Sequence, residues 1–558
     1  MNMFFLLIFK LLTMMKSLRL LRNFGMILAC SGMFSVGVVK AQTVITVEPG
    51  LNTLSDALTA NPGATLLLKR EGDYAVTGTM VINVATIIKG ETEPADARPA
   101  VVSYSALPGE GEKKDMFQFG ANCTFQNFGV IGYTDDGQHL GAIFSFTAPD
   151  ISVTIDGCNI QGAKMVLTTG QDGLTIIQKN NIIFNTSTTG WDNGGGFGCL
   201  WGNDKGDFKS FNNTFFTMGR ILNFGGAGPS GSEAMEHNTY VNGWGDTYYP
   251  IYNEKVTVKN NIFFNTQMRG YVGVLKNGND TTWKGDFTDW QAKEIPVTDV
   301  LAGDCPVFIN TADTLTDGTP NSVHRQVNIT NNVKFYDKTL LDFYAANPII
   351  VKQPFMPATM KEYAVKYSWN IKDNLLEEEG KAIDPQFAMG AIPASAFEMA
   401  FKTRLNRHLP TAEADPAFPF EIAWRPGGEE KGEFIWPMPF NFKPTNKALY
   451  AAGDDGFPLG DLNWFAPEVK AAWEAKQPNP LITSAINIKN EINQSAYIAH
   501  DMLKFKGFGN AVDAEIYSIL GQKVLVAKNI NELNVSSLKR GVYLVRVNNG
   551  SQAFRVVK

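Results

Sequence analysis

Cysteine and histidine are both scarce in this sequence, with five of each among 558 residues. Five cysteines are too few for a disulfide-stabilised scaffold, and the four beyond the N-terminal segment have no CxxC spacing. The histidines have no metal-ligand spacing, and no GxSxG motif supports a Ser-His-Asp hydrolase. A small cysteine-rich protein is therefore excluded, and we expect buried thiols at Cys123, Cys158, Cys199 and Cys305.

Basic side chains are also fewer than acidic ones, 49 against 55. The net charge is −6, and the first 41 residues contain five basic and no acidic side chains. A chain beginning at Gln42 would carry 44 basic against 55 acidic side chains, a net charge of −11. This balance argues against a nucleic acid or an anionic membrane surface as partner, unless a local basic patch forms. A mean hydropathy of −0.11 and 19% charged residues exclude general disorder and a multi-span membrane protein.

A long apolar run is present near the N-terminus. Residues 15–22 are basic, and residues 24–39 form an uncharged, mostly apolar stretch that is followed by small residues. This order is typical of a secretory signal peptide, and we predict one at 1–41, starting at Met1 or Met15. An N-terminal membrane anchor is the alternative, although a span needs ~18 or more apolar residues.

A short motif repeats along the middle of the chain. A polar pair followed by an apolar triplet recurs, with 30, 23, 32, 25, 23 and 71 residues between successive copies. Stacked coils of three short strands produce such spacings, because one coil cannot bury its inner face alone. Asparagine suits the turns since it tolerates the left-handed conformation, and stacked asparagines can form side-chain ladders. The pairs are Asn127-Phe128, Gly157-Cys158, Asn180-Asn181, Asn212-Asn213, His237-Asn238, Asn260-Asn261 and Asn331-Asn332.

These repeats resemble the right-handed parallel β-helix family that includes the pectate lyases. Leu54 to Leu58 and Asn61 to Leu68 resemble the capping helix and first coil of that family. The resemblance implies an all-β fold, with a right-handed parallel β-helix solenoid at 42–345. It implies no single activity, because lyases, hydrolases, epimerases and plain binding proteins share this fold.

The last segment, residues 485–558, has a different pattern. Short alternating strands with glycine at the bends predict a small β-sandwich of immunoglobulin-like type. A turn at Gly521 to Val524, a strand at Leu538 to Val547 and a basic last strand resemble the C-terminal sorting domain of the bacterial type IX secretion system. The resemblance implies that the type IX secretion machinery is a partner, that this domain is cleaved off, and that the protein is secreted, to the medium or the outer cell surface. An ordinary carbohydrate-binding or immunoglobulin-like sandwich is the alternative.

Residues 346–484 contain many Pro and Trp residues and no repeat. We expect this irregular segment to pack along the solenoid and to cover its C-terminal end, with short helices at 360–369 and 467–476. Its acidic loop, Gly453 to Trp464, holds three carboxylates within eight residues. These could bind calcium, but the spacing is not that of an EF-hand, and a solvated turn is the preferred interpretation.

A candidate catalytic site follows from the repeat spacing. Arg220, Asp246 and Arg269 lie seven or eight residues after their repeat anchors, so stacked coils would place them in a column, ~4.8 Å apart, on one flank. The resemblance implies β-elimination on an acidic sugar chain, with Arg or Lys as the base and Ca²⁺ or Arg neutralising the carboxylate. A salt-bridge ladder without catalysis is the alternative. Aromatic side chains suited to stacking on sugar rings lie in nearby loops, namely Trp201, Trp244 and Tyr248.

Two classes of function remain open. The first is a polysaccharide lyase acting on a uronate-containing glycan, which fits better than a glycoside hydrolase and its paired carboxylates. The second is a non-catalytic glycan-binding or adhesin-like surface protein. In both cases the expected partner is a polysaccharide and the expected state is a monomer. The characteristic lyase motifs are missing, no metal-ligand pattern is present, and the cofactor stays open with Ca²⁺ as the candidate.

Overall fold

The computed structural model of the chain describes two compact units, Met1–Lys470 and Ala471–Lys558, which we treat separately. No helix within the described residues is long and apolar enough to cross a membrane. The described ranges are 43–105, 114–134, 140–163, 165–168, 170–186, 206–218, 231–243, 254–268, 307, 323–346, 352–387, 434–438, 441–477, 495–499, 502–506, 511–518, 523–539, 542–547 and 553–558.

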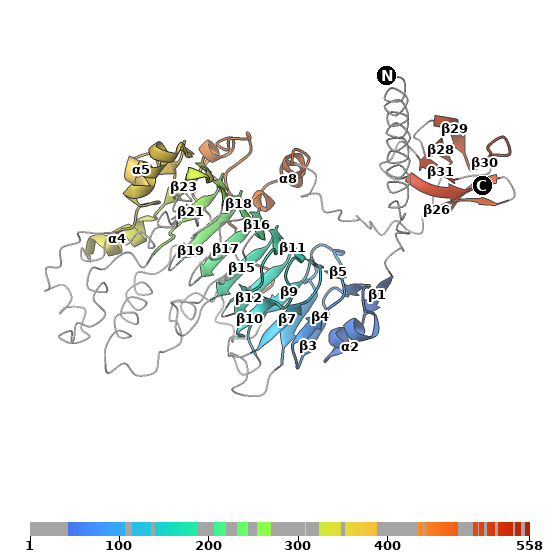
Figure 1. Ribbon diagram of the computed structural model, residues 1–558, viewed down its shortest axis with the longest axis horizontal. Helices are drawn as coiled ribbons and strands as arrows, with labels where there is room; N and C mark the ends of the chain where they lie inside the picture. Colours follow the sequence, from blue (N-terminus) through green and yellow to red (C-terminus); the bar gives the residue numbers. More distant parts are fainter. Residues whose placement is uncertain are drawn as a thin grey trace, which may run out of the picture. The chain divides into compact units, whose positions relative to one another are not determined.

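Three parallel sheets form the first unit (Figure 1). In its first four coils the chain passes through sheets A, B and C and returns to sheet A one strand further on, and in the later described coils it alternates between sheets A and B, which is the path of a parallel β-helix. Sheet A contains β1 (Val44–Val47), β2 (Thr65–Leu68), β5 (Thr86–Gly90), β8 (Cys123–Gln126), β11 (Ser152–Asp156), β14 (Thr175–Lys179), β16 (Gly206–Phe211), β18 (Gly231–Glu236), β20 (Lys255–Lys259), β22 (Gln326–Thr330) and β24 (Asn370–Lys372).

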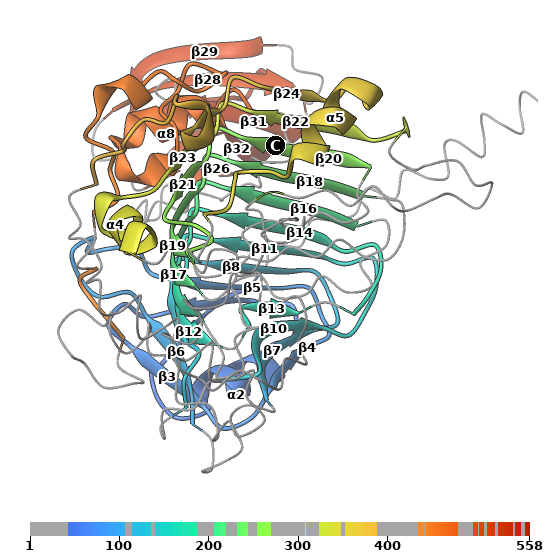
Figure 2. The same ribbon diagram turned by 90° about the vertical axis from the view of Figure 1, so that its left-hand side faces the viewer.

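The other two sheets complete the coils. Figure 2 shows the strands of sheet A stacked in order from β5 to β24, with sheet B running alongside. Sheet B contains β3 (Asp73–Val76), β6 (Val101–Tyr104), β9 (Gly129–Ile131), β12 (Asn159–Ala163), β15 (Ile182–Thr186), β17 (Thr214–Met218), β19 (Thr239–Gly243), β21 (Ile262–Phe264), β23 (Val333–Phe335) and β25 (Leu375–Leu376). Sheet C contains β4 (Met80–Ile82), β7 (Asp115–Phe119), β10 (Ala142–Phe146) and β13 (Leu167–Thr168).

The turn from sheet A to sheet B takes two residues in most coils. The first has a positive φ, for example 59° at Asn180 and 59° at Asn260, which asparagine adopts more readily than most residues. The second is a buried asparagine whose backbone N–H and Nδ2 donate to the Oδ1 of the next one, at 2.8–3.2 Å over five steps. The expected side-chain ladder is therefore confirmed. It runs through Asn181, Asn213, Asn238, Asn261, Asn332 and Asn374.

Alternate residues of each strand point into the solenoid, where they form the core. In sheet B the inward rings of Phe215 and Tyr240 stack with their centroids 5.0 Å apart. The next residue along each of these strands points outward. The strand register places Phe184, Phe216 and Phe264 in one column on this outer face. This confirms the repeat alignment, which requires these three side chains on one face of stacked strands.

Helices close both ends of the core. α2 (Thr53–Ala60) buries Leu54 against the first strands, and α5 (Ala358–Tyr367) buries Met360 at the other end. The coil formed by β24 and β25 lies beyond residue 345, where the sequence-based solenoid ended, because a long excursion separates it from the preceding coil. The remaining helices are α4 (Lys338–Ala346), η5 (Glu377–Glu379), η6 (Lys447–Leu449), η7 (Leu462–Trp464) and α8 (Pro467–Glu474).

The second unit contains two small antiparallel sheets that share one core. Leu503 from one sheet and Ile516 and Val545 from the other are fully buried in it. This agrees with the predicted C-terminal β-sandwich. One sheet contains β26 (Ser495–Ala499), β27 (Met502–Lys506) and β30 (Glu532–Asn534), and the other β28 (Val512–Ser518), β29 (Lys523–Ile530), β31 (Val542–Val547) and β32 (Ala553–Val557).

Candidate functional site

The six residues predicted for the site lie outside the described residues, so their column stays a prediction. These six residues are Arg220, Asp246 and Arg269, with the aromatic side chains Trp201, Trp244 and Tyr248. The sheet B strands that precede the column are described.

The chain leaves sheet B in register just before the predicted column. Met218, two residues before Arg220, pairs with Gly243, three residues before Asp246. The next strand, β21, continues this register, since Val241 pairs with Phe264. The three exits therefore follow one another at the strand spacing, ~4.8 Å.

A second bend lies at the end of the sheet B strands β15, β17, β19 and β21. It also uses positive φ values, 54° at Asn185, 50° at Thr217, 56° at Asn242 and 51° at Asn265. Asn265 Nδ2 donates to Asn242 Oδ1 at 3.2 Å. Among the described residues, several other buried polar atoms here have no hydrogen-bond partner, and leaving such a group unpaired costs about 1–3 kcal/mol. They are Asn185 Oδ1, Thr186 Oγ1, Thr217 Oγ1, Asn242 Nδ2 and Thr266 Oγ1.

The outer face of sheet B is covered by residues 434–465 of the same chain. Phe216 and Val241 pack in one buried cluster with Ile435 and Phe442, and the Phe216 and Phe442 rings lie 5.1 Å apart. These contacts agree with the expectation that part of segment 346–484 packs along the solenoid. They also remove this face from the surfaces that could bind a polymer.

The acidic loop, Gly453 to Trp464, is anchored to the turn between sheets A and B. Asp455 Oδ2 lies 2.9 Å from His237 Nε2, and His237 Nδ1 contacts the Pro458 carbonyl at 3.0 Å. Burial is the largest single influence on Asp455 and would raise its pKa, but the hydrogen bond and charge of His237, the Phe457 N–H and the charge of Lys259 together lower that pKa. Asp454 Oδ1 accepts from Asn260 Nδ2 at 2.8 Å.

The third carboxylate of the loop, Asp461, is buried against sheet B. Thr214 Oγ1 donates to it at 2.7 Å, and Asn463 donates from its backbone N–H at 2.8 Å. Burial raises the pKa of Asp461 to about 7, although both hydrogen bonds act to lower it. Each carboxylate of the loop thus faces a different part of the solenoid. Neither a calcium site nor a solvated turn describes this loop, and the described residues contain no group of three or more His, Cys, Asp or Glu that could hold a metal.

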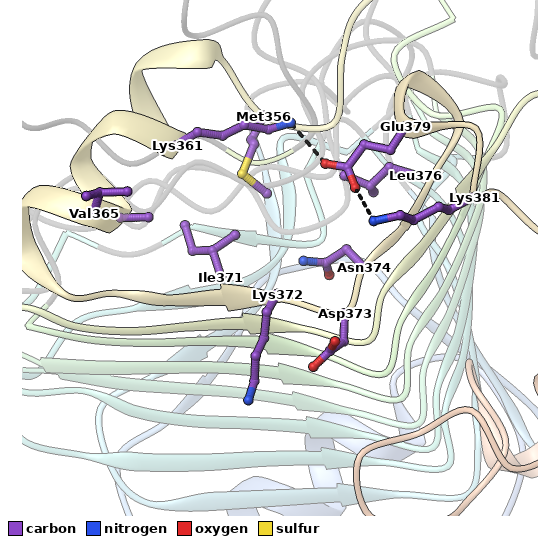
Figure 3. Close-up of a pocket in the computed structure, with 11 residues that line it drawn as sticks. Met356, Lys361, Val365, Ile371, Lys372, Asp373, Asn374, Leu376, Glu379 and Lys381 are labelled. Atoms are coloured by element: carbon purple, nitrogen blue, oxygen red, sulfur yellow. Dashed lines mark hydrogen bonds and ion pairs between the residues drawn. The ribbon is translucent and has the colours of Figure 1, made fainter.

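A pocket of about 400 Å³ lies at the C-terminal end of the solenoid. Its wall comes from α5, β24, β25 and the η5 turn (Figure 3). Lys361 Nζ and Lys381 Nζ both donate to the Glu379 carboxylate, at 3.0 and 3.2 Å. The hydrogen bond from Lys361 is the main cause of the lowered pKa of Glu379. Asn374, the last member of the ladder, lies beneath these ion pairs.

Sequence reasoning identified the acidic loop but missed its anchoring to the solenoid, and it missed the pocket. His237 occupies a turn position that most coils give to asparagine, which is a weak signal for a partner, but Asp455 lies 218 residues further on. The pocket had one signal, the pair Asp373-Asn374 before Leu375 and Leu376, which repeats the motif in shortened form.

Comparisons with known proteins assign the second unit. Residues 478–558 match the family model described as a secretion system C-terminal sorting domain. A search of curated proteins finds no match. Among solved structures, the chain is similar to the PL6 family alginate lyase AlyGC, at 13% identity and a TM-score of 0.26, over 40% of this chain and 36% of that one. The chain thus spans about a third of that relative. The first unit is a parallel β-helix, and the type IX sorting domain that follows it identifies the protein as secreted or cell-surface.

Proposed function

We propose that the protein binds a linear polysaccharide along the flank that follows sheet B. The observation that carries this proposal is the register of the strand exits before Arg220, Asp246 and Arg269. A side chain repeated at the strand spacing offers a linear polymer a series of equivalent contacts. The partner is thus an extended chain with a repeating unit.

The chain's own packing supports this choice of flank. The outer face of sheet B is covered by apolar contacts to residues 434–465. The turn between sheets A and B carries the anchored acidic loop in the coils of His237 and Asn260. At the second bend, by contrast, buried polar atoms have hydrogen-bonding capacity left over.

The finer proposal is a polysaccharide lyase acting on uronate-containing glycan. One of Arg220 and Arg269, in its neutral form, would take the proton beside the carboxylate as the glycosidic C–O bond breaks, and the released oxygen would take up a proton from that arginine or from water. The other arginine, held by Asp246, would neutralise the carboxylate. Trp201, Trp244 and Tyr248 would stack on the sugar rings. A non-catalytic glycan-binding protein would use the same groups for contact alone.

A polysaccharide panel tests binding and catalysis together. The full chain is incubated with uronate-containing and neutral polysaccharides, while unsaturated products, new reducing ends and binding are followed. Unsaturated products identify the lyase, and binding without products identifies the glycan-binding protein. If no polysaccharide is either bound or cleaved, the proposal is overturned.

Single substitutions test the flank. Arg220→Ala and Arg269→Ala should each lower affinity or turnover by about tenfold or more, because each removes a charge-assisted contact. Lys209→Ala is the matched control. Lys209 lies in β16, in the same region of the solenoid as Arg220, but on sheet A and therefore away from the proposed flank. Equal effects of all three changes would overturn the assignment to this flank.

A further inference from the structure

The asparagine ladder has a direction, and its last member has donors to spare. In each of five steps, the backbone N–H and Nδ2 of one asparagine donate to the Oδ1 of the next asparagine toward the C-terminus. Asn374 accepts such bonds from Asn332, and its Nδ2 donates to the Ile329 carbonyl at 2.9 Å. Within the described residues, no acceptor meets its backbone N–H or its second Nδ2 hydrogen.

These donors lie at the pocket of Figure 3. Asn374 is one of its lining residues and is 6% exposed. In every other step of the ladder, a carboxamide oxygen occupies the position that the two donors address. The pocket therefore offers a preformed pair of N–H donors to one ligand oxygen.

The charges around these donors favour an anion. Figure 3 shows Lys361 and Lys381 directed at Glu379, above the Asn374 amide, so two ammonium groups face one carboxylate. Lys372 and Asp373 point away from this triad, across the neighbouring strands, and offset each other in charge. Each ammonium gives one hydrogen to Glu379 and has others available for a ligand. A ligand carboxylate would restore charge balance in the pocket.

The remaining walls suit a small ring. Ile371 and Leu376 give the pocket an apolar side, and Glu379 can accept a hydrogen bond from a ligand hydroxyl. The volume of about 400 Å³ is at the lower end of small-molecule sites, which run from about 300 to 1,000 Å³. An extended peptide strand fits less well, because α5 lies over β24 and closes the groove into a pocket.

We propose that this pocket binds the carboxylate of a sugar acid. One carboxylate oxygen takes the place of the next carboxamide oxygen in the ladder and accepts from Asn374, while Lys361 and Lys381 neutralise the charge. The ring lies against Ile371 and Leu376, and a hydroxyl donates to Glu379. A free uronate and the terminal residue of a uronate polymer present the same chemistry. The site is separate from the flank proposed above, so either proposal can fail alone.

Calorimetric titration of the full chain tests the pocket with paired probes. Galacturonate and galactose differ only in the carboxylate, and a galacturonate oligomer tests the terminal residue of a polymer. We expect the uronates to bind at least tenfold more tightly than galactose, with an affinity that falls as salt is raised. Equal affinity for galactose, or no binding of either uronate form, overturns the proposal. Binding of the monomer or of the oligomer alone identifies the source of the carboxylate.

Three variants assign the binding to the pocket. Replacing both Lys361 and Lys381 with Met should weaken uronate binding by about tenfold or more. Glu379→Gln keeps the hydrogen-bonding shape and removes a negative charge, so it should strengthen binding several-fold. Lys366→Met is the control, because Lys366 lies on α5 over the Tyr367 ring and outside the pocket. An unchanged affinity in both pocket variants, with thermal midpoints like that of Lys366→Met, overturns the assignment.

Discussion

The two bends that flank sheet B are built from the same residue type but differ in their hydrogen bonding. Before sheet B, Asn261 donates to Asn332 and to the Met235 carbonyl, and accepts from Asn238. After sheet B, Asn185 and Asn242 have the positive φ that Asn260, the residue before Asn261, has at the first bend. Asn260 bonds with both ends of its side chain to Asp454, whereas Asn185 and Asn242 each leave one side-chain atom unpaired among the described residues. A left-handed asparagine therefore marks a turn, and only its hydrogen bonds say whether the turn is complete within the fold.

The largest effect is expected at the satisfied bend. Asn261→Ala removes hydrogen bonds to both neighbouring coils and leaves the buried N–H donors of Asn238 without an acceptor. The free energy of unfolding should therefore fall by about 3–5 kcal/mol. Chemical denaturation of the purified chain measures this. Asn185→Gly at the other bend is the matched control, because glycine accepts a φ of 54° and no side-chain oxygen is left unpaired. Equal losses in the two variants would remove the distinction between the bends.

The anchored loop offers the next largest effect, and it depends on pH. The Asp461 pKa is raised in the folded state to about 7, so its contribution to stability is complete below about pH 4 and is lost as pH rises through 7. Asp461→Asn keeps the uncharged form at every pH. We expect the variant to gain about 2–4 kcal/mol over the wild type between pH 4 and pH 8. Parallel stability curves for the two proteins would show that Asp461 is ionised in the fold.

The smallest effect is a further gain in stability, and it lies at the second bend. Thr217 is β-branched, has a φ of 50° and buries an unpaired Oγ1. Thr217→Gly relieves the backbone strain and removes that atom, and should stabilise the protein by about 1 kcal/mol. Thermal unfolding measures the change. A loss of stability would mean that the hydroxyl is satisfied and that the bends are alike.

The repeats predicted the solenoid because its turns are chemically demanding. Asn180 and Asn260 mark turns where the backbone must adopt a positive φ, so the spacing of such pairs reports the coils directly. The coil that contains Asn374 escaped detection, since the excursion before it holds two helices and its strands have only three and two residues. Periodicity reveals a coil only where neighbouring coils are close in sequence.

The pocket and the anchored loop could not be predicted in this way. Lys361, Asn374 and Glu379 belong to a helix, a turn and a 3₁₀ helix, which meet only because α5 closes the end of the core. Asp461 similarly gains its raised pKa from burial against Thr214, a contact across 247 residues. Local sequence carries no record of such contacts, and the predicted column of Arg220, Asp246 and Arg269 rests on spacing alone.

The direction of the ladder runs parallel to the order of synthesis. Each asparagine donates to an oxygen that is translated later, so a chain that emerges from its N-terminus always has one unfinished turn at its growing front. The loop that anchors to His237 and Thr214 arrives about 220 to 250 residues after its docking sites, once every coil has been made. The sorting domain at 478–558 follows both. Export through that domain therefore begins only after the segments that complete and lock the solenoid exist.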